Sequence, residues 1–234
     1  MSRVPYTIEI SRDAGIRAKA LTLRARVFRD GKSDEDRFDA DAYHGVILDE
    51  SSHIECCFRL NIFDSDGAAQ SGYTGQFYDL TPLSNCHGPV VELGRLARHP
   101  DKTNPDILRV AFAAIADFVV SHNAQALFGC TSFQGLSPSP YNACFSCLAH
   151  SHLLPDGQRP VPRSCRSFPL TDVPFDHAQA LRSMPPLLRS YLRLGGRTSR
   201  AAVIDPDLQT IHVYTRLNIA NVANARRKTL LNRV

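Results

Sequence analysis

Apolar and polar positions alternate along much of the chain, a pattern that is typical of half-buried β-strands. The alternating segments are separated by stretches rich in Gly, Pro, Asn and Asp, which favour turns. The predicted strands cover residues 6–10, 45–49, 54–63, 90–97, 124–131, 201–204 and 211–219. The polar run 49–52 predicts a hairpin between the second and third of them.

Other segments place apolar residues three or four apart, which predicts helices. The first helix follows Ser11 or Asp13 as N-cap and carries small or apolar residues at Ile16, Ala20, Leu23 and Val27. The second is expected to start with Asn104 as N-cap and Pro105 as the first helical residue. Two shorter helices are predicted over residues 140–150 and 186–194.

In chain order these elements mix hairpins with helical connections, which indicates an α/β fold with a mixed sheet. The chain has 234 residues, so we expect residues 1–234 to form a single domain. Residues 153–180 carry five prolines and little periodicity. We therefore expect a lid or insertion, over about residues 137–200.

Composition excludes several classes of protein. With 13 Gly and 15 Pro, collagen-like and low-complexity chains are excluded. The longest apolar run, 110–120, is broken by Asp117 and is much shorter than the roughly 20 residues of a membrane span. No basic-then-apolar leader opens the chain, so we expect an intracellular protein. The net charge of +4 favours an acidic partner or membrane surface, and we expect no nucleic-acid partner.

The seven cysteines are expected to be reduced thiols, since no secretion signal is present. Cys144-x-x-Cys147-x-x-His150 has two interpretations: metal ligands on one helical face, or the buried side of a helix. A zinc site usually needs a second ligand pair, which the sequence lacks. We therefore favour the buried helix and expect no metal.

The most informative short motif is Glu92-Leu93-Gly94-Arg95. Residues three apart on a regular strand point to opposite faces, so Glu92 and Arg95 serve one pocket only if the strand is bulged. A bulge would cost the least conformational free energy at Gly94, and it would free a backbone N–H to stabilise an oxyanion. Between apolar neighbours, Glu92 would be a general base. A structural Glu–Arg pair is the alternative.

Further charged residues form a second constellation. Arg24 and Phe28 lie one helical turn apart, and Asp36 and Asp39 follow in an acidic loop. Arg59 lies inside an apolar strand and needs a carboxylate partner, which either aspartate would supply. Both a loop clamped over a pocket and a purely structural ion-pair cluster fit this pattern.

A third feature is the helix start at 104–106, with Lys102 just ahead of it. Free N–H groups at a helix N-terminus favour anions, although an ordinary capped helix has the same sequence.

In this order, Arg24, Phe28, Asp36, Asp39, Arg59, Glu92 and Arg95 resemble the framework shared by acyl-homoserine-lactone synthases and ornithine N-acyltransferases. Both resemble branches of the GCN5-related N-acyltransferase fold, which implies an α/β structure with a mixed central sheet flanked by helices. Later segments are similar to the ornithine N-acyltransferases in particular. These segments are 77–80, 92–101, 128–133, 185–195, 204–205 and 213–214.

The resemblance implies transfer of a 3-hydroxyacyl group from acyl carrier protein to the α-amine of L-ornithine, the first step of ornithine-lipid synthesis. It implies no cofactor beyond this thioester co-substrate. Glu92 would be the base. The residues expected to bind the acceptor are Arg24, Phe28, Asp36, Asp39, Arg59 and Arg95. Those expected to bind the acyl-pantetheine arm are Lys102, Asn104, Cys130, Thr131 and Phe133.

Two departures from the family pattern leave alternatives open. The Gly-rich loop that binds coenzyme A is replaced by residues 100–106, without glycine, which favours acyl carrier protein as donor. His212 stands where the family has an acidic residue, so glutamine or glycine remain alternative acceptors. An acyl-homoserine-lactone synthase using S-adenosylmethionine, or a non-catalytic module that binds acyl carriers, are further alternatives.

Two basic groups of residues have a predicted role in docking. Arg226, Arg227, Lys228 and Arg233 form one, and Arg189, Arg193 and Arg197 form the other. Both suit acidic carrier protein or anionic lipid, although solvated surface charge gives the same pattern. We expect the protein in the cytoplasm or at the inner face of the cytoplasmic membrane.

Overall fold

The computed structural model describes residues 6–64, 68–85, 88–102, 104 and 106–222. The basic tail formed by Arg226, Arg227, Lys228 and Arg233, and Pro105 of the predicted helix start, lie outside the described residues. The chain divides into two compact units. Unit 1 comprises residues 1–62, 91–123 and 224–234, and unit 2 comprises residues 63–90 and 124–223.

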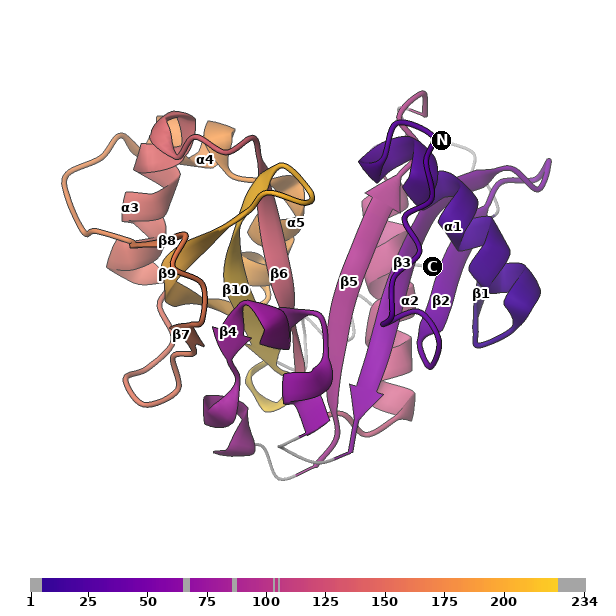
Figure 1. Ribbon diagram of the computed structural model, residues 1–234, viewed down its shortest axis with the longest axis horizontal. Helices are drawn as coiled ribbons and strands as arrows, with labels where there is room; N and C mark the ends of the chain where they lie inside the picture. Colours follow the sequence, from indigo (N-terminus) through magenta and orange to yellow (C-terminus); the bar gives the residue numbers. More distant parts are fainter. Residues whose placement is uncertain (1–5, 65–67, 86–87, 103, 105, 223–234) are drawn as a thin grey trace. The chain divides into compact units, whose positions relative to one another are not determined.

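Unit 1 contains four strands in the order β1-β2-β3-β5, with antiparallel pairing of β1 with β2 and of β2 with β3. Helices α1 and α2 lie on opposite faces of these strands (Figure 1). The bounds are β1 Thr7–Ser11, α1 Ala14–Phe28, β2 Tyr43–Leu48, β3 Ile54–Phe63, β5 Val90–Arg98 and α2 Ile107–Ser121.

Helix α1 begins where the sequence predicts it. Asp13 is its N-cap, and the Asp13 carboxylate accepts hydrogen bonds from the backbone N–H groups of Gly15 and Ile16 at 2.7 and 3.3 Å. Its buried face packs Ala20 and Leu23 against the sheet. Arg24 lies on this buried face as well, which brings a full charge into the interior.

Unit 2 contains an antiparallel sheet in the order β6-β10-β9-β8. One face packs against three helices, and the other against β4, which pairs with β7, and several 3₁₀ turns. The main elements are β6 Ala126–Gln134, α3 Asn142–Ser151, β8 Ser167–Pro169, α4 His177–Ser183, α5 Pro186–Arg193, β9 Arg197–Asp205 and β10 Thr210–Asn218.

The small elements of unit 2 are mostly single turns. The short strands are β4 Tyr78–Asp79 and β7 Val161–Pro162. The 3₁₀ turns are η1 Ala68–Ser71, η2 Thr74–Gln76, η3 Thr81–Asn85, η4 Ser139–Tyr141 and η5 Ile219–Asn221. Tyr78, Leu80 and Leu83 from these segments pack against Phe128 and Tyr214 of the sheet.

The predicted α/β fold is confirmed, with a mostly antiparallel sheet flanked by helices. The seven predicted strands and four predicted helices are present, within a few residues at most ends. Helix α4 and the two-residue strands were not predicted, because they are too short to show a period. Residues 137–200 lie in unit 2, and their action as a lid stays a prediction.

The predicted start of the second helix is wrong. Helix α2 begins at Ile107, preceded by Asp106, whose side chain makes no capping hydrogen bond. The Asn104 side chain instead accepts a hydrogen bond from the Asp106 N–H at 2.9 Å. Such an Asx turn satisfies the backbone before the helix starts, which moves the helix start towards the C-terminus.

Cys144 and Cys147 lie on the buried side of helix α3 and pack in the core of unit 2. Burial raises the pKa of Cys144 to about 12. His150 lies at the surface and contacts Asp172 at 3.2 Å. The packing of both cysteines confirms the interpretation as the buried side of a helix.

Candidate active site

Three arginine and three aspartate side chains form a buried cluster in unit 1, joined at its edge by Arg29. Arg24 comes from α1, Arg59 from β3 and Arg95 from β5. The aspartates come from the loop between α1 and β2 and are Asp34, Asp36 and Asp39. We call this group the Arg–Asp cluster.

Arg24 is at the centre of the Arg–Asp cluster and has no exposed surface. Its Nε donates to Asp34 Oδ2 at 2.8 Å, and its Nη1 donates to Asp39 Oδ1 at 2.6 Å. Nη2 donates to Asp39 Oδ2 at 3.1 Å and to the Asp34 carbonyl oxygen. Arg24 therefore connects both ends of the acidic run 34–39 to helix α1.

The strands contribute the other guanidinium groups. Arg59 Nη1 donates to Asp36 Oδ1 at 2.5 Å and to Asp39 Oδ1 at 2.8 Å. Arg95 Nε donates to Asp34 Oδ2 at 2.9 Å, and its Nη2 to Asp36 Oδ2 at 3.1 Å. Each aspartate is thus shared by at least two arginines, which fixes the loop against the sheet.

Aromatic rings cover part of the Arg–Asp cluster. The guanidinium carbon of Arg95 lies 6.0 Å from the ring centre of Phe28, and that of Arg59 lies 5.6 Å from the ring centre of Phe38. These distances are within the range of cation–π attraction. Phe28 is also half-buried against the apolar core of unit 1.

Electrostatics hold Arg24 and Asp39, two members of the Arg–Asp cluster, in their charged forms. Burial by itself would raise the pKa of Asp39, but the Arg24 hydrogen bond and the charge of Arg59 outweigh it and hold that pKa well below its usual range. For Arg24, burial acts to lower the pKa, and its bonds with Asp39 and Asp34 raise it overall. Buried His44, beside Asp39, has its pKa lowered mainly by burial.

The sequence pointed to Asp36 and Asp39 but missed Asp34. Asp34 is 2% exposed and accepts hydrogen bonds from Arg24, Arg29 and Arg95. Nothing in the acidic run 34–39 separates the buried aspartates from exposed Glu35. Only the arginines that converge from α1, β3 and β5 identify Asp34.

Glu92 is 3% exposed on β5, in the same unit. The backbone irregularity that the motif predicts lies at Arg95, whose φ of 53° is in the left-handed region, and not at Gly94. A non-glycine residue in this region stores roughly 1–3 kcal/mol of strain. The Arg95 side chain is anchored by hydrogen bonds to Asp34 at 2.9 Å and to Asp36 at 3.1 Å, which help to hold this residue in place.

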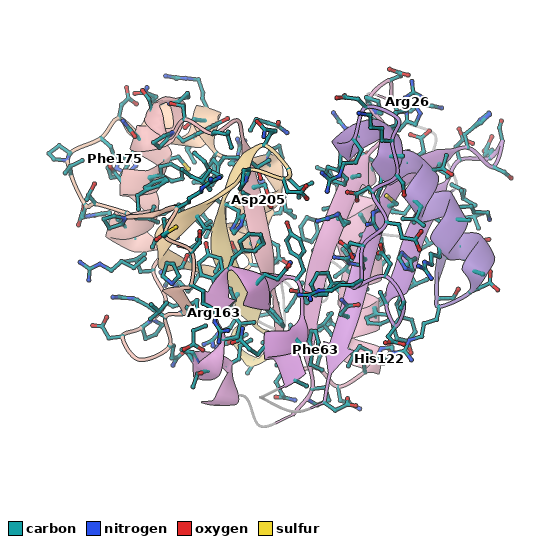
Figure 2. The ribbon with its side chains drawn as sticks, in the orientation of Figure 1. Arg26, Phe63, His122, Arg163, Phe175 and Asp205 are labelled. Atoms are coloured by element: carbon teal, nitrogen blue, oxygen red, sulfur yellow. The ribbon has the colours of Figure 1, made fainter. Side chains whose placement is uncertain are left out.

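Lys102 and Asn104 follow β5. Lys102 Nζ lies 2.9 Å from Glu55 Oε1 and 3.2 Å from Asp49 Oδ2, and these hydrogen bonds raise the pKa of Lys102. Asn104 Nδ2 donates to the Tyr6 hydroxyl at 2.6 Å. Lys102 also lines a surface pocket of about 350 Å³ with Arg26 and His99. Figure 2 shows Arg26 at the edge of unit 1.

In unit 2, the three residues predicted to hold the acyl-pantetheine arm lie on two faces of β6. Thr131 donates to the Thr215 hydroxyl at 3.0 Å, and Phe133 packs in the helical core. Cys130 points to the other face, where its Sγ lies 3.7 Å from Thr74 Oγ1. This separation follows from the two-residue period of a strand.

The chemistry of these groups is acid–base and electrostatic. In the described part of the chain, no three His, Cys, Asp or Glu side chains are grouped as a metal site. Glu92 supplies a buried carboxylate, and the Arg–Asp cluster supplies a charged framework in the same unit.

A family model described as acetyltransferase (GNAT) domain matches residues 21–112. The L-ornithine N(alpha)-acyltransferase of Rhodobacter capsulatus is 31% identical, over 98% of this chain and 96% of that protein. The chain belongs to the L-ornithine N(alpha)-acyltransferase family. It is therefore an N-acyltransferase, as the resemblance implies.

Solved structures support the same fold. The acyl-homoserine-lactone synthase LasI has a TM-score of 0.53 at 15% identity, covering 98% of this chain and 95% of that chain. FeeM, an N-acyl amino acid synthase from uncultured soil microbes, has a TM-score of 0.54 at 9% identity, covering 92% and 91%. At these identities the likeness concerns the fold alone.

The matched acetyltransferase region contains the Arg–Asp cluster, Glu92, Lys102 and Asn104, whereas Cys130, Thr131 and Phe133 lie beyond it. In this member of the L-ornithine N(alpha)-acyltransferase family, the cluster arginines and aspartates bond to one another. The geometry gives them a positioning role for the loop between α1 and β2. Their predicted contact with the acceptor stays a prediction.

Proposed function

We propose that this enzyme transfers a 3-hydroxyacyl group from acyl carrier protein to the α-amine of L-ornithine, the first step of ornithine-lipid synthesis. The observation that carries the proposal is the relationship, over 98% of the chain, to a protein named L-ornithine N(alpha)-acyltransferase. Buried Glu92 in the acetyltransferase region supports the chemistry.

The reaction needs a neutral amine. An α-ammonium group has a pKa of about 8, so it is mostly protonated near neutral pH and must lose a proton before attack. In the proposed step, Glu92 accepts this proton, directly or through water. The amine nitrogen then attacks the thioester carbonyl carbon, the C–N bond forms, and the C–S bond breaks to release the pantetheine thiol. General-base help of this kind is typically worth about 10²–10⁴-fold.

Acyl carrier protein is proposed as donor because residues 99–106 contain no glycine. Without a glycine-rich turn, few backbone N–H groups can approach a pyrophosphate closely. The single phosphate of a pantetheine arm needs fewer such N–H groups than a pyrophosphate does. The surface pocket beside Lys102, Arg26 and His99 offers basic groups of the right kind for it.

The place of action follows from the product. An acylated amino acid with a long chain belongs in a lipid bilayer, and no helix among the described residues has the length and apolarity of a membrane span. We therefore propose that the enzyme works at the inner face of the cytoplasmic membrane. Arg189, Arg193 and Arg197 would contribute to an electrostatic contact with anionic lipid or carrier protein.

The decisive experiment is reconstitution with purified components. The enzyme, 3-hydroxyacyl carrier protein and an equimolar mixture of ornithine, glutamine and glycine are incubated, and products are identified by mass spectrometry. We expect 3-hydroxyacyl-ornithine as the main product. Acyl-glutamine or acyl-glycine as the main product would show that the acceptor is a different amino acid. Acyl-homoserine lactone formed after addition of S-adenosylmethionine would contradict the proposed reaction as a whole.

The role of Glu92 has its own test. Glu92→Gln keeps the size and removes the base, so we expect turnover to fall about 10²–10⁴-fold with an unchanged melting temperature. Glu50→Gln, at an exposed position of the hairpin, is the matched control and should keep full turnover. Full turnover in Glu92→Gln would remove this residue from the mechanism.

A further inference from the structure

Arg216 on β10 is a second buried arginine, in unit 2, and its surroundings differ from those of the Arg–Asp cluster. It is 3% exposed. Its Nη2 donates to the side-chain oxygen of Gln158, a neutral group. Its Nε and Nη1 have no hydrogen-bond acceptor in the described residues. Within the same residues, no carboxylate lies at ion-pair distance from it.

A buried guanidinium without an anion is unusual on physical grounds. Transfer of a charge from water to the interior costs several kcal/mol unless a partner compensates for it. The aspartates of unit 2 that form ion pairs do so elsewhere, with His150, Arg159 and Arg163. A site that keeps such a charge is expected to receive its counter-ion from outside the described residues.

Neighbouring side chains on β10 extend this observation. His212, Tyr214, Arg216 and Asn218 alternate along the strand and therefore share one face. The register with β6 is continuous over this stretch, with Arg216 opposite Phe128. His212 Nε2 and Asn218 Oδ1 are also buried without a partner in the described residues. Three polar side chains on this face thus have hydrogen-bonding capacity that the described residues do not satisfy.

We propose that Arg216, positioned by Gln158, binds the oxyanion of a ligand, a carboxylate or a phosphate group. A guanidinium is permanently charged and presents five N–H donors, which suits both groups. This inference is independent of the proposed acceptor and donor, because it rests on the surroundings of Arg216 alone. Two sources of the oxyanion fit the chemistry, an amino-acid carboxylate and a phosphate ester.

The test measures binding to the full-length protein by isothermal titration calorimetry and by the shift in melting temperature. The probes are L-ornithine, with 1,4-diaminobutane as the analogue without a carboxylate, and inorganic phosphate, with chloride at equal ionic strength as its control. We expect the wild type to bind at least one oxyanion probe more tightly than its control. Arg216→Gln should weaken that binding by about tenfold or more.

A second variant separates binding from folding. Gln158→Glu places an internal carboxylate beside Arg216, so it should raise the melting temperature of the unliganded protein and weaken oxyanion binding. Arg200→Gln, at an exposed position of neighbouring β9, is the matched control and should bind like the wild type. A merely structural Arg216 would leave binding unchanged in Gln158→Glu.

The two probes identify the source of the oxyanion. Arg216-dependent binding of ornithine but not of diaminobutane assigns a carboxylate, and Arg216-dependent binding of phosphate assigns a phosphate ester. A wild type that binds neither probe, or variants that bind both as well as the wild type does, would overturn the proposal. Because these are binding measurements, their failure is distinct from a failure of the acyl transfer assay.

Discussion

The two units of this enzyme each contain buried arginine side chains, but the groups that contact these arginines differ in charge. In unit 1, Arg24, Arg59 and Arg95 contact aspartates at 2.5–3.1 Å. In unit 2, Arg216 contacts a neutral glutamine. In the first arrangement every guanidinium has carboxylate partners, whereas in the second no carboxylate of the described residues pairs with the guanidinium, whose Nε and Nη1 are left without acceptors.

This difference separates positioning from binding. A guanidinium that pairs with carboxylates of its own chain holds structure in place, and the loop of residues 29–42 is the segment that the cluster arginines hold. A guanidinium without a carboxylate partner in the described residues is the one that we propose binds a ligand anion. Sequence alone gives no such distinction, because Arg24, Arg59 and Arg216 each lie in a segment with apolar residues beside them and none shows which carboxylates are near in space.

The sharpest prediction applies the same substitution to both units. Arg24→Gln should destabilise the protein by about 3–5 kcal/mol, because it leaves buried Asp34 and Asp39 without their partner. Arg216→Gln should leave the unliganded protein as stable as the wild type or more so, because it removes an uncompensated charge. Urea unfolding of both variants measures the difference.

Arg26→Gln is the control for Arg24. It lies on the same helix, its side chain is 54% exposed and it pairs with Asp101 at the surface, so its loss should cost at most about 1 kcal/mol. Equal losses in Arg24→Gln and Arg216→Gln would remove the distinction between the two arginine environments.

The units should also differ in pH dependence. Burial lowers the pKa of His212 to about 4, against the opposing charge of Asp205, which Figure 2 places in unit 2. Between pH 6.5 and 4, the unfolded state binds a proton that the folded state does not. Stability is therefore complete above pH 6.5 and falls by roughly 3 kcal/mol as the pH drops to 4.

Unfolding measured from pH 7 to 4 tests this expectation. His212→Gln should lose the fall in stability over this range, whereas His177→Gln, exposed on α4, should retain it. An unchanged slope in His212→Gln would assign the pH dependence to other groups.

The Arg–Asp cluster responds at lower pH. Because the folded-state pKa of Asp39 is depressed, its contribution is complete above the unfolded value of about 3.9 and is lost as the pH falls below it towards the folded value. Hydrogen exchange should therefore show the loop of residues 29–42 opening only below about pH 4. Asp39→Asn should open this loop already at neutral pH, and protection equal to the wild type would contradict the role given to Asp39.

The smallest expected effects concern helix caps. Asp13 caps α1 in unit 1 and Asp176 caps α4 in unit 2, each through its carboxylate. Replacement of either by Ala should cost about 1 kcal/mol. Asp106→Ala is the control, because Asp106 makes no capping bond, and it should change stability by at most about 0.5 kcal/mol. An equal loss in all three would show that the caps carry no specific stability.

Much of the fold could be predicted because its signals are local. The alternation over 54–63 and 211–219 specifies strands, and Asp13 before a helical period specifies the start of α1. The start of α2 was wrong because Asn104 has two local uses, as a helix cap and as an Asx turn. Both uses satisfy the same backbone groups, so the sequence does not choose between them.

The site was predicted in part. The sequence indicated that Arg59 needs a carboxylate and that Asp36 or Asp39 would supply it, and both contact it. It missed Asp34, and it gave no role to Arg216. Most of their partners are far away along the chain: Arg24 and Arg95 lie 10 and 61 residues from Asp34, and Gln158 lies 58 residues from Arg216.

The sequence by itself determined the family of this protein, its elements and the residue types available for proton transfer. Periodicity, helix caps and motifs depend on residues that are close together in the sequence, so they can be identified without a structure. Only the tertiary structure decided which buried charges are neutralised, because a counter-ion is a matter of distance in space. The Arg–Asp cluster and Arg216 differ in their carboxylate partners, and this difference separates a framework from a proposed binding group.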